Sequence, residues 1–163
     1  MTYRITATHT FDAPIEVVEA GMTDPAFYAQ LELPDVETPE VVGHEDDGAD
    51  VTVTIRMVFN GHLDSFARRI VGNRELAWVQ TVSLDREHHT GRLRVKPDAK
   101  MPITVDAGYA LTEADGVTTR VLEGGLSVPV PMLGGRAERS IGPGVQRRLD
   151  IEAAALGEWL TRA

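Results

Sequence analysis

Residues 127–145 read SVPVPMLGGRAERSIGPGV, and this stretch joins two kinds of secondary structure. Pro129 and Pro131 stand in a run that otherwise has the composition of a β-strand. Proline donates no backbone hydrogen bond and these two share one parity, so strand pairing on one side is expected to stop by about Val128. Gly134-Gly135 then permits a turn into a helical pattern that contains Pro143. The stretch predicts an abrupt strand end followed closely by a helix.

The helical pattern continues almost to the end of the sequence. Its apolar residues recur at spacings of three and four: Leu133, Ala137, Ile141, Val145, Leu149, Ala153, Leu156 and Leu160. Such a stripe is typical of a long amphipathic helix that covers a core. Pro143 removes the hydrogen bond to the carbonyl of Arg139, but the apolar phase runs on across it. A single kinked helix is therefore predicted rather than two separate helices.

The strand before this helix is predicted to span about residues 117–131, and its apolar pattern changes phase. Val117 and Val121 have one parity, whereas Leu126 has the other. Because a shift of one residue turns inward side chains outward, an extra residue is expected between the two sets. Gly124-Gly125 lies at the junction, and glycine suits a β-bulge. A bulge or sharp bend is predicted there.

The N-terminal part predicts one strand and two short helices. Residues 3–11 alternate between apolar and polar side chains, as a half-buried strand does. An N-cap at Asp12 or Ala13 and a second at Asp24 are each followed by a proline, which suits the first turn of a helix.

The middle of the chain has the pattern of an antiparallel sheet. A hairpin is predicted to turn at residues 46–48, where two aspartates precede a glycine. Further strands are expected at about 76–85, 89–97 and 102–113. The segment 62–76 between them fits either a helical turn or a loop.

This order of elements predicts one α+β domain over residues 1–163 with a helix-grip fold. A curved antiparallel sheet of about seven strands would carry two short helices after its first strand, and the long C-terminal helix would cover its concave face. These helices are too few to fill the whole concavity, so an internal cavity is expected.

Composition excludes several classes of function. The net charge is −9, and an acidic chain is poorly suited to neutralise the phosphates of nucleic acid. Cysteine is absent, which removes disulfides and thiolate metal sites. No apolar stretch approaches the length of a membrane span, and no charged leader precedes an apolar block, so a cytoplasmic protein without integral membrane association is expected.

The chain resembles the START-like (SRPBCC, helix-grip) superfamily over nearly its full length. The resemblance rests on THTFDAPIEVVEAGMTDPAFYAQL near the start and on LSVPVPMLGGRAER with the later EWL near the end. The runs FARRIVGNRELAWVQTV and VPVPMLGGRAERSI are similar to an uncharacterised branch described mainly from actinobacteria, which implies a bacterial source. The resemblance implies the fold more than a function, since superfamily members bind lipids, sterols, polyketides or proteins, and some are enzymes.

Candidate ligand-binding residues are those on apolar strand faces and on the first half of the long helix. They are His9, Phe11, Ile55, Met57, Phe59, Trp78, Gln80, Val82, Tyr109, Glu123, Met132, Leu133, Ile141 and Val145. The polar members are expected to be either structural or anchors in an apolar cavity, and Glu123 is the candidate for a perturbed carboxyl group.

No metal or cofactor site is predicted. His88 and His89 lie near acidic residues, but adjacent side chains in a strand or turn point apart, so a solvated turn is favoured over a chelating pair. Arg92, Arg94 and Lys96 share one strand face and are expected to lie on the solvated outside of the sheet.

Three functions fit the sequence. The favoured one is a module that binds a hydrophobic or lipid-like small molecule. The second is an enzyme of the polyketide cyclase or aromatase kind that uses His9, Tyr109 or Glu123 for acid–base chemistry, which requires at least two of them to converge on one cavity. The third is a protein-interaction domain without a ligand, which would expose an apolar patch.

Overall fold

A computed structural model describes residues 2–73, 75–98 and 102–162. Its sheet has seven antiparallel strands in the order β1-β7-β6-β5-β4-β3-β2. The strands are β1 (Tyr3–Phe11), β2 (Glu40–Asp46), β3 (Asp50–Val58), β4 (Ala77–Asp85), β5 (Thr90–Pro97), β6 (Thr104–Ala114) and β7 (Val117–Ser127). The helices are α1 (Ile15–Met22), α2 (Pro25–Ala29), α3 (Ser65–Val71) and α4 (Gly134–Thr161). The predicted fold class is confirmed. The segment 62–76, for which the sequence fitted either a helical turn or a loop, contains the short helix α3.

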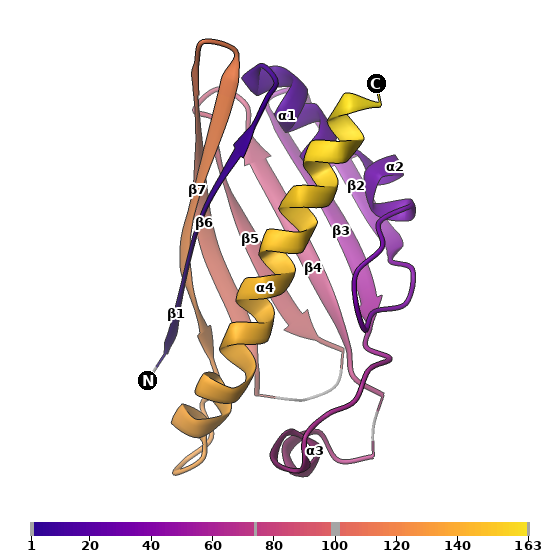
Figure 1. Cartoon of the computed structure of the whole chain (residues 1–163), viewed down its shortest axis with the longest axis vertical. Coiled ribbons are helices and arrows are strands. Elements are labelled where there is room, and N and C mark those ends of the chain that lie inside the picture. Colours follow the sequence, from indigo (N-terminus) through magenta and orange to yellow (C-terminus); the bar gives the residue numbers. More distant parts are fainter. Residues whose placement is uncertain (1, 74, 99–101, 163) are drawn as a thin grey trace.

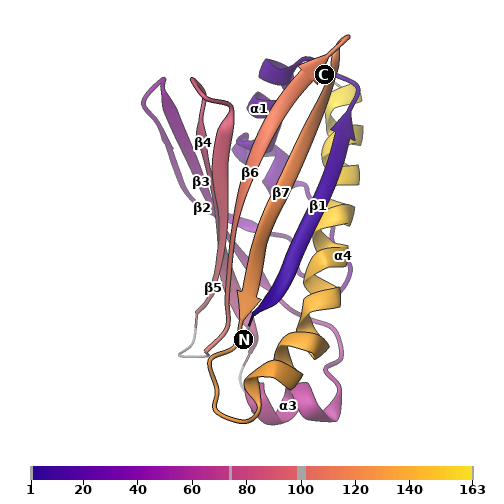
Figure 2. The ribbon, with the colours of Figure 1, turned by 90° about the vertical axis from the view of Figure 1, so that its left-hand side faces the viewer.

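The long helix α4 crosses one face of the sheet, with α1 and α2 near its C-terminal end and α3 near its N-terminal end (Figure 1). Seen from the side, the sheet curves and α4 lies closest to β1 (Figure 2). This is the helix-grip arrangement. It leaves the part of the concave face formed by β3, β4 and β5 farther from the helix axis.

Alternation of side chains along the strands builds the core. In β3, Val51, Val53, Ile55 and Met57 are buried. On α4 the buried members of the apolar stripe are Ala137, Leu149, Ala153 and Leu156, and Ile141, Val145 and Leu160 pack against the core at partial exposure.

The predicted β-bulge in β7 is wrong. Pairing of β7 with both β1 and β6 proceeds one residue at a time through Gly124 and Gly125. The inward face of β7 carries the even-numbered residues throughout, whereas Val117 and Val121 are exposed. Thr118 faces inward because its hydroxyl donates to the carbonyl of Ala13 at 2.7 Å. The apparent change of phase came from polar residues on the buried face.

The junction between β7 and α4 follows the expectation from the two prolines. The strand ends at Ser127, and the backbone N–H of Val128 donates to the Glu138 carboxylate at 2.9 Å instead of to a neighbouring strand. Glu138 is 2 % exposed, so the first turn of α4 holds the end of the strand. The helix then runs without a break past Pro143, and the prediction of a single helix is confirmed.

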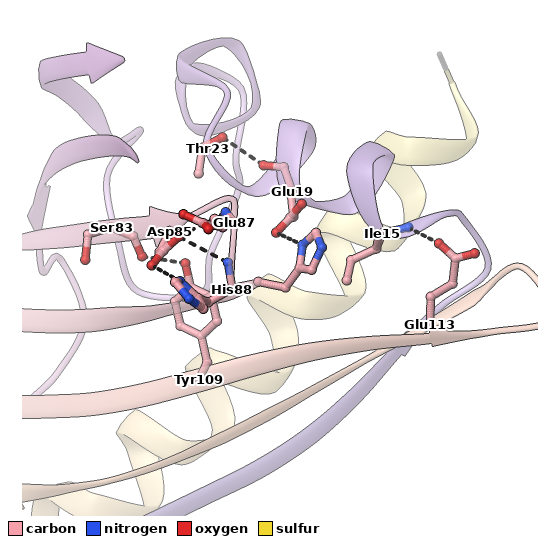
Figure 3. A network of polar contacts seen from close by, with 10 residues as sticks. Ile15, Glu19, Thr23, Ser83, Asp85, Glu87, His88, Tyr109 and Glu113 are labelled. Carbon is pink, nitrogen blue, oxygen red and sulfur yellow. Dashed lines mark hydrogen bonds and ion pairs between the residues drawn. The ribbon is translucent and has the colours of Figure 1, made fainter. Parts of the chain in front are cut away.

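The first helix begins differently from the prediction. Its N-cap is Pro14, which offers no side-chain acceptor, rather than Asp12 or Ala13. The carboxylate of Glu113, at the end of β6, instead accepts the N–H of Ile15 at 2.7 Å (Figure 3). A negative group at this position also suits the positive end of the helix dipole. The second helix is capped by Asp24, as predicted.

Candidate functional site

A cavity of about 450 Å³ lies between the concave face of the sheet and α4, with α3 at one end. Its walls are mostly apolar and come from β3 to β7 and from α4 between Ser140 and Glu152. Six of the residues predicted from the sequence line it: Met57, Phe59, Trp78, Gln80, Ile141 and Val145. These positions share the parity or helical spacing of the apolar residues around them, and Gln80 alternates with Trp78 and Val82 in this way.

The other predicted residues lie elsewhere. Val82 and Tyr109 line a separate space of about 20 Å³ deeper in the core. Phe11 and Ile55 are buried in the core and are absent from the lining of either space.

Three residues predicted to line the cavity, Glu123, Met132 and Leu133, are exposed instead. Glu123 is exposed on the outer face of β7, because the strand keeps its phase and has no bulge. Met132 is fully exposed and Leu133 is 46 % exposed. Both belong to the turn before α4, where Met132 adopts a positive φ and Leu133 is the N-cap residue, so neither side chain joins the inward stripe of the helix.

The most buried polar pair of the large cavity joins β4 to α4. Gln80 Nε2 donates to Glu152 Oε1 at 3.1 Å, and Gln80 is 5 % exposed. Burial raises the pKa of the Glu152 carboxyl, and the positive charge of Arg120 and the hydrogen bond from Gln80 oppose this shift without cancelling it. Glu152 lines both the large cavity and the small space, so it is a polar group that the two share.

A second charged group of the cavity wall is Arg148. Its guanidinium carbon lies 5.6 Å from the ring centre of Phe59 and 5.4 Å from that of Trp78, within the range of cation–π contacts. Its Nε is buried and has no hydrogen-bond partner among the described residues. Burial lowers the pKa of Arg148, but a guanidinium keeps its proton at neutral pH.

His9 belongs to a polar chain at the edge of the core, outside the large cavity. Arg120 Nη2 lies 3.0 Å from His9 Nδ1, and His9 Nε2 lies 2.8 Å from Asp150 Oδ1. A guanidinium can only donate, so Nδ1 accepts and the ring proton sits on Nε2, facing Asp150. This chain ties β7, β1 and α4 together, and Arg120 also covers the ring of Phe11 at 5.5 Å.

The three acid–base candidates do not converge on one cavity. His9 is engaged with Arg120 and Asp150, and Glu123 faces outward. The Tyr109 hydroxyl donates to the carbonyl of Ser83 at 2.5 Å, and burial raises the pKa of this phenol (Figure 3). The arrangement required for the predicted catalytic group is therefore not present.

The two adjacent histidines bind different partners. His88 Nδ1 lies 2.7 Å from Asp85 Oδ2 in an exposed turn (Figure 3), whereas His89 Nδ1 lies 2.9 Å from Glu19 Oε2. Both histidines lie in the predicted turn, and the His89 side chain is 36 % exposed. Its partner Glu19 is buried, so His89 connects the β4–β5 hairpin to α1. Within residues 2–73, 75–98 and 102–162, no three His, Cys, Asp or Glu side chains are placed to hold a metal ion.

The His89–Glu19 pair predicts a pH-dependent contribution to stability. The hydrogen bond to Glu19 raises the pKa of His89, so the contribution is complete below the ordinary histidine pKa and is lost as pH rises through the folded-state value. The variant His89→Asn suits the positive φ at this position. We expect it to lower the free energy of unfolding by about 1 kcal/mol or less at about pH 5.5, and by less at about pH 9, in urea denaturation.

The control is the same substitution in a Glu19→Gln background. In that background His89→Asn should lower the free energy of unfolding by the same amount at both pH values, because the charge of residue 19 is gone. An equal cost at both pH values in the original background would contradict an ionic role for this pair.

Sequence reasoning missed Arg120, Arg148 and Glu152. Charged residues on a helix are usually solvated, and Arg148 and Glu152 lie beside the apolar stripe rather than within it. Their spacing of four residues, one helical turn next to Val145 and Leu149, is the signal that places both on the edge of the inward face. Arg120 shares its parity with Leu122 and Leu126, and this parity is the signal that places it on the inward face of β7.

Comparison with known families and structures gives one family match and several structures of the same fold. A family model described as Protein of unknown function (DUF2505) matches residues 6–160. No functionally curated protein matches the sequence. Among the described residues, no helix is long and apolar enough to span a membrane.

Solved structures resemble the chain over nearly its whole length. Zhui aromatase/cyclase from Streptomyces sp. R1128 aligns with a TM-score of 0.70 at 17% identity and covers 99% of this chain and 95% of its own. The protein TTHA0849 from Thermus thermophilus aligns at 0.66 and 18%, covering 98% and 97%. A START superfamily protein from Mycobacterium smegmatis aligns at 0.58 and 12%, covering 98% of each chain. At these identities the likeness establishes the fold alone.

Proposed function

The chain belongs to the family described as Protein of unknown function (DUF2505), and we propose that it binds a hydrophobic small molecule in the cavity between the sheet and α4. The observation that carries the proposal is the cavity itself. Its volume of about 450 Å³ is within the range of small-molecule sites, and apolar walls with a few convergent polar groups are their usual composition.

The wall composition supports an apolar ligand. Met57, Phe59, Trp78, Ile141 and Val145 are large apolar side chains around one space, and covering them would remove apolar surface from water. Structures of the same fold include a protein titled an aromatase/cyclase and a START superfamily protein, and this likeness is compatible with a ligand-binding fold.

Binding of a neutral apolar fluorophore tests the proposal. We expect N-phenyl-1-naphthylamine to bind with one molecule per chain and to gain fluorescence, and native mass spectrometry after gentle purification to detect a co-purified small molecule. Addition of a tighter apolar ligand should release the fluorophore. The absence of both a co-purified molecule and saturable fluorophore binding would refute a ligand-binding cavity.

An acid–base enzyme is the second candidate, and Glu152 is the observation that favours it. A carboxyl group with a raised pKa can hold a proton beside a bound molecule and release it during a reaction. If the protein is a cyclase, a bound polyketide-like substrate should lose water in the wild type and stay unchanged in Glu152→Gln, with both proteins binding it. Identical masses in both would favour a binding module.

The remaining expectations from the sequence stay predictions. They are a cytoplasmic location, an origin in an actinobacterial branch of the START-like superfamily, a single domain, and independence of cofactors and nucleic acid. A protein-interaction domain without a ligand also stays open. Its test is the fluorophore experiment, because such a domain would not bind the fluorophore saturably.

A further inference from the structure

Arg148 places a positive charge in the wall of a mostly apolar cavity. Two aromatic side chains, Phe59 and Trp78, flank the guanidinium, and its Nε is buried without a hydrogen-bond partner in the described part of the chain. Buried donors of this kind are nearly always paired, and a buried cation normally has an anion or a dense set of acceptors. Arg148 therefore offers a donor without a hydrogen-bond partner and a charge that contacts two aromatic rings but no carboxylate among the described residues.

No acidic group around the cavity forms an ion pair with the Arg148 guanidinium. Ion pairs within 4.0 Å are present elsewhere among the described residues, but none of them includes Arg148. Asp35 is near enough only to raise the pKa of Arg148 against the larger effect of burial, and it is exposed. Glu152, one turn further along α4, accepts a hydrogen bond from Gln80 and forms no ion pair with Arg148.

We propose that the ligand of this cavity is an apolar monocarboxylic acid whose carboxylate binds the Arg148 guanidinium while its apolar part lies against the sheet. The inference rests on the proposed binding function and adds the chemical class of the ligand. A carboxylate fits the planar fork of a guanidinium, so it can accept from Nε and from a terminal nitrogen together.

The number of charges favours a carboxylate over a phosphate. Two arginines of the wall, Arg147 and Arg148, have no ion-pair partner among the residues that the structure describes, but Arg147 is exposed to solvent. Only the partly buried charge of Arg148 needs a partner inside the cavity, and a carboxylate brings one negative charge. A phosphate monoester brings about 1.5 to 2 negative charges at neutral pH and would leave part of its charge desolvated and unmatched.

A matched set of ligands tests the inference. Dodecanoic acid, dodecanol and dodecyl phosphate share one apolar chain, as do 2-naphthoic acid and 2-naphthalenemethanol. For the wild type, displacement of N-phenyl-1-naphthylamine should give at least about tenfold tighter binding of each acid than of its alcohol, and tighter binding of dodecanoic acid than of dodecyl phosphate. Arg148→Gln should remove the preference for the acids and keep binding of the alcohols, and Arg148→Lys should restore part of it.

Arg139→Gln is the control, because it removes the same charge from the exposed side of the same helix. It should leave the preference for acids unchanged, and circular dichroism should show that all variants are folded. Equal binding of acids and alcohols by the wild type, a preference for the phosphate, or a preference that survives Arg148→Gln would overturn the inference and leave the cavity as a binding site. If the fluorophore and every compound fail to bind, both the inference and the proposed function fall.

Discussion

Replacement of Gly124 by alanine is expected to destabilise the protein by about 3 kcal/mol, the upper end of the usual cost of overpacking. A Cβ atom at this position would lie 2.2 Å from the carbonyl oxygen of Asp106 and 2.4 Å from the Cα of Ala107. Both atoms belong to the backbone of β6, the neighbour of β7, so the two strands would have to separate. Urea denaturation of the wild type and of Gly124→Ala measures the loss.

The neighbouring residue provides a matched control. A Cβ at Gly125 would meet mainly Thr2 Cγ2, at 2.3 Å, which is the end of a side chain near the start of the sequence and can move. Gly125→Ala is expected to cost less than about 1 kcal/mol. Equal losses for the two variants would mean that β7 does not approach β6 on the side where the structure places it. The comparison therefore also tests the continuous register that replaces the predicted bulge.

The order of elements could be predicted from the sequence because each signal is local. Alternation marks the strands, an aspartate before a glycine marks the first hairpin, and proline after Asp24 marks a helix start. The phase of β7 could not be predicted in this way. Its buried face carries Thr118, Arg120 and Gly124, and such residues depend on partners distant in sequence, such as the carbonyl of Ala13 for Thr118.

The same distinction explains the outcome for the site. Apolar residues of the cavity follow the periodicity of their strand or helix, so their facing was predictable. Arg148 and Glu152 are charged, and the default for such residues on a helix is solvent. Their actual position depends on how far the curved sheet stands from α4, which no local pattern encodes. Met132 and Leu133 were misplaced because both precede α4, which begins at Gly134.

Gly144 lies in the wall of the cavity, on α4. Its neighbours in the wall are the apolar residues Ile141 and Val145 and, one turn further on, the charged Arg148. A Cβ built there has no heavy atom within 4 Å, and its backbone conformation is open to any residue. We expect Gly144→Phe to weaken binding of N-phenyl-1-naphthylamine by about a hundredfold, because the new ring would occupy the space that the fluorophore needs. Stability should rise by about 0.5 kcal/mol, since glycine is a poor helix former.

Opposite changes in binding and stability separate loss of the cavity from loss of the fold. Gly157→Phe is the matched control, because Gly157 lies on the same helix, has equally open space around its Cβ position and does not line the cavity. It should raise stability by a similar amount and leave the affinity for the fluorophore within about twofold of the wild type. If both phenylalanine variants bind the fluorophore as the wild type does, the molecule sits outside this cavity. In that case the space under α4 is not the ligand site, whatever the affinity of the protein for apolar compounds.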